Sequence, residues 1–224
     1  MKAKVAWIEM AAMTAAVVSF IWLWSGAFPG SSAAIVVLYF GIPLAGHLRR
    51  GETPRDLGLR LDNFGKSLRD VLVFVGPLVP IPILIGGLLG SLDFLADYDG
   101  SLWVGALQRI AWSTAQQYAL VAFFYRRSTE VVPGTWPPIV LAAGIFGLVH
   151  LPNPFLTVVT FLLGSLSCWL YRRVPNVFVL GLAHAVLSFA ISRSLPVGLT
   201  FKMRVGPGFL EVWERLYGFF WTLF

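Results

Sequence analysis

The stretch STAQQYALVAFFYRR, residues 113–127, places two adjacent amides inside an apolar run that stops at two arginines. The run begins near residue 103, and about 20 apolar residues are what an α-helix needs to cross a lipid bilayer. A primary amide inside a bilayer is costly unless its donors and acceptors are matched. The stretch therefore predicts a transmembrane helix that contains a polar site.

The composition extends this interpretation to the whole chain. Hydrophobic residues make up 57% of the 224 residues, and only 12% are charged, about half the usual share for a soluble domain. The net charge of +6 lies in short clusters between apolar runs, so we do not expect a nucleic-acid partner. The single cysteine, Cys168, excludes an internal disulfide. We expect an all-α fold, a polytopic transmembrane helical bundle that forms one integral membrane domain over residues 1–224.

Seven apolar runs are candidates for membrane spans, and an eighth is weaker. The seven runs cover residues 5–24, 32–47, 71–91, 103–125, 136–152, 155–171 and 176–192. The eighth, 209–224, carries charges on one side and either lies on the membrane surface as an amphipathic helix or forms a last span. The sequence therefore predicts seven to eight helices. A short amphipathic helix at the inner surface is also expected over residues 55–70.

The charges between the runs predict the orientation of the bundle. Lysines and arginines gather before the first run, in segment 48–70, and directly after the fourth and sixth runs, and these regions fall on one side if every run spans. Asp93, Asp97 and Asp99 fall on the other side. Because basic loops stay in the cytoplasm, we expect a multi-pass protein of the cell (inner) membrane with a cytoplasmic N-terminus, surrounded by membrane lipid.

Three polar sites lie inside the predicted spans: Gln116 with Gln117, His150 and His184. At ~1.5 Å per residue, Gln116, His150 and His184 lie ~15, ~20 and ~12 Å from the inner ends of their helices. All three depths are near the middle of the bilayer. For each site alone, helix–helix hydrogen bonding is the usual explanation. The matched depths lead us to expect one shared cavity.

These residues resemble the motifs of the CPBP family of intramembrane proteases, which includes the type II CAAX prenyl endopeptidases. The family pattern is a Glu-Glu pair followed after three residues by Arg, then Phe-x-x-x-His, then His-x-x-x-Asn or Asp. The same order and spacing occur here, with Gln116 and Gln117 for the pair, Val121 for the arginine, Phe146 with His150, and His184 with Ser188. The resemblance covers about residues 50–192.

The resemblance implies a peptidase in which the first glutamate activates a water, while the histidines and asparagine hold that water and stabilise the oxyanion. A glutamine amide cannot take the proton, so Gln116 can only orient a water. Val121 and Ser188 are departures too, and the loss of the arginine fits the loss of the acids, because an unpaired buried arginine is costly. The expectation is an intramembrane protease-like protein with impaired or altered catalysis that cleaves or binds membrane-anchored peptides.

Three functions remain open on these residues. His150 or His184 could be the base of a protease with Gln116 as an oxyanion donor. The chain could instead be a non-catalytic scaffold that binds a peptide or lipid-anchored segment. It could also be a small-molecule transporter or a purely structural bundle, with a coincidental family resemblance. We expect no cofactor and no metal, because no carboxylate or thiol lies at the depth of the histidines and amides are poor ligands. Glu9 and Arg109, near span ends, are expected to be structural.

Overall fold

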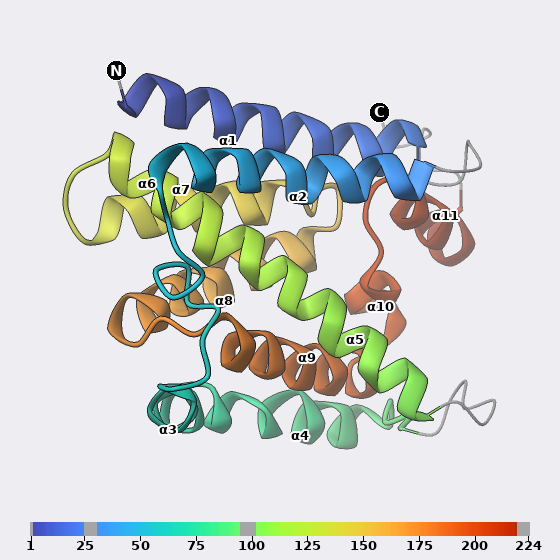
Figure 1. Ribbon diagram of the computed structural model, residues 1–224. Coiled ribbons are helices and arrows are strands. Elements are labelled where there is room, and N and C mark those ends of the chain that lie inside the picture. The colour runs from blue at the N-terminus through green and yellow to red at the C-terminus, as the bar shows by residue number, and fades with distance from the viewer. Residues whose placement is uncertain (1, 25–30, 95–101, 219–224) are drawn as a thin grey trace.

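The computed structural model describes residues 2–24, 31–94 and 102–218, which form helices joined by short connections and contain no β-strand (Figure 1). The expected all-α bundle is confirmed. The first half contains α1 (Lys2–Ser19), η1 (Phe20–Trp24), α2 (Ser31–Arg50), α3 (Phe64–Phe74), η2 (Gly76–Leu78) and α4 (Pro80–Leu89). The second half contains α5 (Leu102–Gln117), η3 (Tyr118–Tyr125), α6 (Arg126–Val131), α7 (Trp136–Leu148), α8 (Pro154–Arg173), α9 (Val177–Ser194), α10 (Val197–Thr200), η4 (Phe201–Met203) and α11 (Gly206–Tyr217).

Helices of membrane-spanning length lie at the predicted places. Among the described residues, four helices are long and apolar enough to cross a membrane: Lys2–Leu23, Phe64–Leu89, Pro154–Arg173 and Val177–Ser194. They coincide with four of the seven predicted runs. The other three runs correspond to α2, to α5 with its π-helical continuation η3, and to α7, which has 13 residues. The expectation of an integral membrane protein is therefore confirmed.

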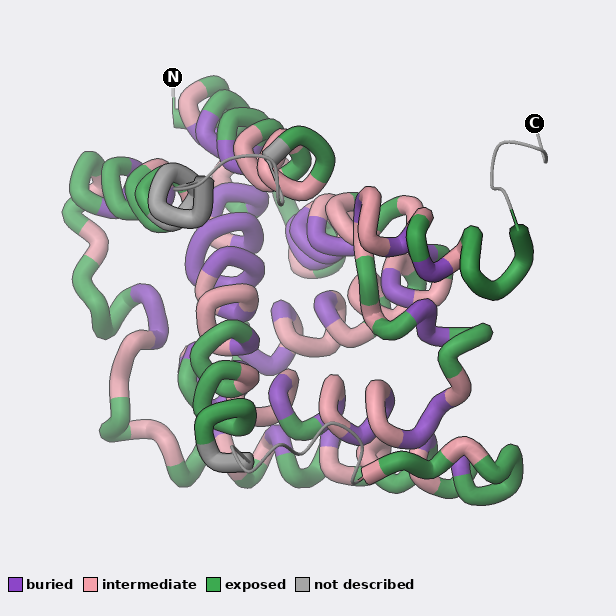
Figure 2. The backbone as a smooth tube through the Cα atoms, turned by 90° about the vertical axis from the view of Figure 1, so that its right-hand side faces the viewer, coloured by how far each residue is buried: buried purple, intermediate pink, exposed green. Residues whose placement is uncertain are grey.

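The helices are arranged around a central core. In Figure 1, α1 and α2 lie side by side along one edge and α3–α4 along the opposite edge, with α8 and α9 between them. Helix α5 crosses the bundle diagonally and packs against α9. Buried residues concentrate along the middle of the bundle, while much of the outer helices is exposed (Figure 2). The π-helical segment η3 supplies much of this core, since Leu120, Val121 and Phe123 are fully buried.

A glycine on α9 allows the close contact between α5 and α9. A Cβ atom on Gly181 would lie 2.7 Å from the Cα atom of Thr114, which is closer than real side chains approach. Small residues at such a crossing let two membrane helices pack backbone to backbone. The close contact fixes the depth at which residues of α5 face residues of α9.

A buried ion-pair network holds one end of the bundle together. Arg127 of α6 is fully buried, and its guanidinium lies 3.2 Å from Glu9, 2.6 Å from Glu52 and 2.8 Å from Glu130. Arg50 pairs with two of the same carboxylates, at 3.0 Å from Glu9 and 2.9 Å from Glu130. Because each buried charge faces opposite charges, the network ties α1, α2 and α6 together.

Glu52 is the acid most strongly affected by this network. Burial alone would raise the pKa of its carboxyl, because a low dielectric disfavours the charged form. Hydrogen bonds from Arg127, His47 and Arg126 outweigh burial, and the pKa of Glu52 falls to about 2. Glu52 is therefore ionised at any physiological pH.

Arg109, the other charged residue expected to be structural, lies on α5 away from the network. Its guanidinium lies over the ring of Phe189, 5.6 Å from the ring centroid. A cation over an aromatic face is a favourable packing arrangement. The contact adds to the packing of α5 against α9.

The prediction of an amphipathic helix over residues 55–70 is wrong for the first half of this segment, because α3 begins at Phe64. The preceding segment forms turns instead. The Asp56 carboxylate accepts hydrogen bonds from the backbone amide and the hydroxyl of Thr53, at 2.9 and 2.6 Å. Gly58 has φ +72°, a left-handed conformation that interrupts a helix. Local turn chemistry therefore outweighs the amphipathic pattern.

An asparagine connects the start of α8 to the segment before α11. Asn153 is fully buried and caps α8, accepting a hydrogen bond from the amide of Leu156 at 3.0 Å. Its side-chain nitrogen donates to the carbonyls of Thr200, at 3.1 Å, and Arg204, at 2.9 Å. Between these carbonyls, all three residues of Phe201–Met203 have positive φ, from 51° to 56°. Asn153 thus binds the carbonyls on both sides of a left-handed turn that contains no glycine.

The last described helix, α11, is amphipathic. Helix α11 has 12 residues, about 18 Å at 1.5 Å per residue, which is too short to cross a bilayer. Phe209 and Val212 are buried on its inner side, while Glu211 and Glu214 are exposed. Of the predicted features, residues 25–30, Asp97, Asp99 and residues 219–224 lie outside the described residues.

Candidate functional site

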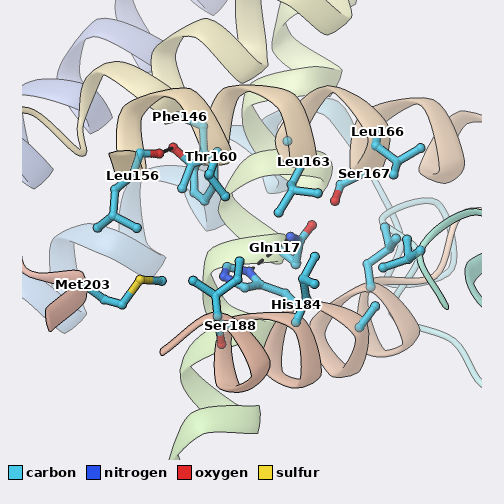
Figure 3. Close-up of a pocket in the computed structure, with 17 residues that line it drawn as sticks. Gln117, Phe146, Leu156, Thr160, Leu163, Leu166, Ser167, His184, Ser188 and Met203 are labelled. Atoms are coloured by element: carbon cyan, nitrogen blue, oxygen red, sulfur yellow. Dashed lines mark hydrogen bonds between the residues drawn. The ribbon is translucent and has the colours of Figure 1, made fainter. Parts of the chain in front are cut away.

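A cavity of about 60 Å³ lies between α8 and α9, beside the end of α5 (Figure 3). Most of its lining is apolar, and no charged side chain occurs among the described residues that line it. Its polar lining consists of Gln117, Thr160, Ser167, His184 and Ser188. The volume is enough for ordered water, because a cavity of roughly 10–15 Å³ can hold one water molecule.

Gln117 and His184 form the polar centre of the cavity. The amide nitrogen of Gln117 lies 3.2 Å from Nδ1 of His184 and donates a hydrogen bond to it (Figure 3). This bond uses the lone pair of Nδ1, so the ring proton of the neutral imidazole sits on Nε2. His184 can therefore offer an N–H donor to a group in the cavity.

The amide oxygen of Gln117 is buried and has no hydrogen-bond partner among the described residues. The whole residue is 4% exposed. Figure 3 shows this oxygen on the side of the cavity where Ser167 of α8 lies. A buried carbonyl-type oxygen costs free energy until a donor pairs with it. A water or a ligand N–H that reached this oxygen would remove that cost.

His150 follows α7 and lies beside the cavity rather than in its lining. Its Nδ1 lies 2.6 Å from the carbonyl oxygen of Phe146 and donates to it. This bond leaves Nε2 as the nitrogen with a free lone pair in the neutral ring. The ring of Phe146, which does line the cavity, packs edge-on against His150 with centroids 5.0 Å apart.

The remaining sequence-predicted residues are placed less centrally. The hydroxyl of Ser188 donates to the carbonyl of Ala185 at 3.1 Å, and in Figure 3 it points away from Gln117. Gln116 is half-buried and does not line the cavity. Val121 is fully buried in the core and does not line the cavity either. The structure thus brings together Gln117, His184 and Phe146, with Ser188 at the edge.

Residues suited to a metal are not clustered. Within the ranges that the structure describes, no group of three or more histidine, cysteine, aspartate or glutamate side chains is placed to hold an ion. The chemistry of the cavity is therefore that of one imidazole, one amide and hydroxyl groups.

Sequence reasoning missed the contribution of α8 and of η4. Thr160, Gly164 and Ser167 line the cavity from α8, and Met203 lies at one end of it (Figure 3). The three α8 residues are spaced by four and three positions, which places them on one helix face. That spacing of small and polar residues in an apolar helix was the available signal. No sequence pattern indicates that Met203 lines the cavity, because its position depends on the turn Phe201–Met203, which lies far along the chain from Gln117.

A family model described as type II CAAX prenyl endopeptidase Rce1-like matches residues 102–190. The expected family resemblance is confirmed for this segment. The Rce1-like segment contains all seven predicted site residues but is shorter than the expected range of 50–192, because residues 50–101 lie outside the match. No curated protein and no solved structure matches the chain significantly. The match supports an intramembrane protease-like protein that works among membrane lipids.

Proposed function

We propose that this chain binds a membrane-anchored peptide segment at Gln117 and His184, and that its hydrolytic activity is impaired. The observation that carries the proposal is the hydrogen bond between these two side chains in a cavity without a carboxylate. The Rce1-like match supports a peptide as the class of ligand.

The two free polar positions of the site match a peptide group. His184 offers Nε2–H as a donor, and Gln117 offers its unpaired amide oxygen as an acceptor. A peptide bond carries one carbonyl acceptor and one N–H donor, so both of its polar atoms can be satisfied at once. An extended transmembrane segment exposes such groups where its helix is interrupted.

Hydrolysis is impaired because the cavity lining lacks a base. An amide has no useful basicity, and the lone pair of Nδ1 in His184 is taken up by Gln117. His184 would therefore polarise a bound peptide carbonyl, but no activated water would stand beside that carbonyl to attack it. Donor stabilisation of an oxyanion accelerates a reaction only when a nucleophile is present.

A second candidate function is slow hydrolysis with His150 as the base. The observation that favours it is the donation from Nδ1 of His150 to Phe146, which leaves Nε2 free to accept a proton. In this case a water between His150 and the cavity would attack the bound peptide carbonyl, with His184 as the oxyanion donor.

Binding and cleavage of one lipid-anchored fluorescent peptide, measured in lipid nanodiscs, separate these functions. We expect His184→Ala and Gln117→Ala to weaken binding about tenfold, since each removes a hydrogen bond to the peptide. Gln116→Ala is the matched control and should bind as the wild type does. Equal binding by wild type and both cavity variants would overturn the proposal.

The cleavage arm uses the same peptide. We expect little or no cleavage by the wild type, and loss of any residual cleavage in His150→Ala would favour the second candidate. Gain of cleavage in a Gln116→Glu, Gln117→Glu, Val121→Arg variant would support a silenced hydrolytic site. Rapid cleavage that survives both His150→Ala and His184→Ala would contradict both functions. Solute uptake into liposomes without peptide binding would favour the transporter alternative.

A further inference from the structure

A second pocket lies away from the Gln117–His184 cavity, at the end of two membrane helices. It is open, encloses about 380 Å³, and includes Arg126 and Arg172 in its lining. Arg126 directly follows the π-helical end of the α5 span, and Arg172 lies in the last turn of α8. Residues just beyond the ends of spans lie at the level of the lipid headgroups. The pocket therefore opens where phosphate groups of the surrounding lipids are found.

The acidic residues of the pocket are already neutralised. Glu52 pairs with Arg127 at 2.6 Å and with Arg126 at 2.5 Å. Glu130 pairs with Arg50 at 2.9 Å and with Arg127 at 2.8 Å. Their carboxylates thus face guanidinium groups, and their charges contribute little net repulsion to an anion in the pocket.

Arg172 is the charge in this pocket that remains available. It is exposed, and its guanidinium makes no ion pair or hydrogen bond with the described residues. The neighbouring Arg173, by contrast, has partners within the protein. It pairs with Asp70 at 3.2 Å, and its guanidinium carbon lies 4.8 Å from the ring centroid of Trp169. Arg173 is therefore engaged within the protein. Arg172 lines the pocket, and its five N–H donors have no partner among the described residues.

The surroundings favour a lipid over a free anion. The pocket is also lined by the tyrosines Tyr125 and Tyr171 and by Pro175, which joins α8 to α9. Phe178, in the first turn of α9, is exposed close to this connection in the chain. The two tyrosine rings are buried in the core, whereas the exposed ring of Phe178 offers an apolar surface that lipid chains can contact. A ligand with a phosphate group and apolar chains fits both parts of this surface.

We propose that this pocket binds the phosphate group of an anionic phospholipid from the adjacent leaflet, with Arg172 as its main ligand. The guanidinium would hold two phosphate oxygens in the bidentate geometry that arginine provides. Arg126, fixed by Glu52 and by the carbonyl of Asp56 at 2.9 Å, would form the rigid wall behind the phosphate. The bound lipid would brace the ends of α5–η3 and α8 against each other.

The test measures thermal unfolding of the purified full chain in neutral detergent by tryptophan fluorescence, with added short-chain lipid. We expect phosphatidic acid to raise the midpoint, and phosphatidylcholine and inorganic phosphate to leave it unchanged. Arg172→Gln should bind phosphatidic acid about fivefold more weakly, as expected for one arginine at an anionic headgroup. Arg173→Gln is the matched control, with the same charge change one residue away, and should respond as the wild type does.

Several outcomes would overturn the proposal. An equal response of wild type and Arg172→Gln to phosphatidic acid would show that the lipid acts elsewhere. An equal loss in Arg172→Gln and Arg173→Gln would show a general charge effect rather than a pocket. Stabilisation by inorganic phosphate alone would assign the site to a free anion. Arg172→Lys keeps the charge without the bidentate fork and should show an intermediate response, which guards against an unrelated folding defect.

Discussion

Gln116 and Gln117 are neighbours in the sequence but have different surroundings. Successive helical residues point about 100° apart, and the structure turns Gln117 toward His184 while Gln116 is half-buried outside the cavity. The sequence alone predicted two amides at the depth of the histidines. It assigned the oxyanion or water-orienting role to Gln116, whereas the contact belongs to Gln117, because helix rotation depends on how α5 packs against α9.

The two glutamines should differ in their contribution to stability. We expect Gln117→Ala to lower the free energy of unfolding by about 1–3 kcal/mol, because it leaves Nδ1 of His184 without a partner. Gln116→Ala should cost less than about 0.5 kcal/mol, as is usual away from buried networks. Thermal unfolding in detergent micelles measures both. Similar costs for the two variants would contradict the central place of Gln117.

Glu52 should make the stability of the protein depend on acidity. Its pKa is lowered from 4.5 to about 2 in the folded protein, so the stabilisation is complete above about pH 4.5 and is lost as the pH falls toward 2. Glu52→Gln removes this contribution, and we expect it to cost about 3 kcal/mol at pH 7, because it removes a carboxylate from the buried Arg127.

The comparison is made by thermal unfolding between pH 7 and pH 3. The wild type should lose stability below pH 4.5 more steeply than Glu52→Gln. Asp70→Asn, which breaks the more exposed pair with Arg173, serves as the control and should cost at most about 1 kcal/mol. Parallel pH profiles of the wild type and Glu52→Gln would rule out the network as the source of acid sensitivity.

At the scale of the elements, the long apolar runs were readable from the sequence, whereas the capping residues were found only in the structure. Asn176 ends the α8–α9 connection and caps α9 by accepting from the amide of Val179 at 3.0 Å. The turns before α3 were not predicted, because the leucines of this segment imitate an amphipathic helix while Gly58 and the Thr53–Asp56 turn interrupt it. The π-helical geometry of η3 was also missed, since π-helical turns are rare in proteins.

The contact between α5 and α9 should tolerate no side chain at Gly181. We expect Gly181→Ala to lower the free energy of unfolding by about 1–3 kcal/mol, because the new methyl group would overlap Thr114. It should also weaken peptide binding, since the same contact sets the distance between Gln117 and His184. Gly144→Ala on α7 is the control, because no atom lies within 4 Å of the added Cβ. If Gly181→Ala left the free energy of unfolding unchanged, α5 and α9 could move apart without loss of stability, which would contradict this prediction.

At the scale of the whole molecule, the sequence predicted a membrane bundle and the helices that carry the site. Apolar length and four-residue spacings contain that information. It did not predict which polar groups would line one cavity, because depth along a helix says nothing of rotation about its axis. His150 illustrates this limit, since it hydrogen-bonds to Phe146 and does not line the cavity.

The orientation of the bundle is open to a direct test. The charge pattern predicts that Lys66 faces the cytoplasm and that residue 92, beyond α4, faces outward. In a Cys168→Ala background, Leu92→Cys should react with an impermeant maleimide in intact cells, whereas Lys66→Cys should react only after permeabilisation. Both positions are exposed in the structure, so accessibility depends on the membrane alone. The reverse labelling pattern would invert the predicted topology.

The left-handed turn Phe201–Met203 has a consequence for what can enter the cavity. Each such residue costs roughly 1–2 kcal/mol relative to the right-handed conformation, and Asn153 helps to offset this cost by holding the carbonyls on both sides of the turn. Met203 stands at the end of the cavity as long as the turn is kept. Because Asn153 itself does not line the cavity, we expect Asn153→Ala to move Met203 and change the length of the cavity without replacing any lining residue.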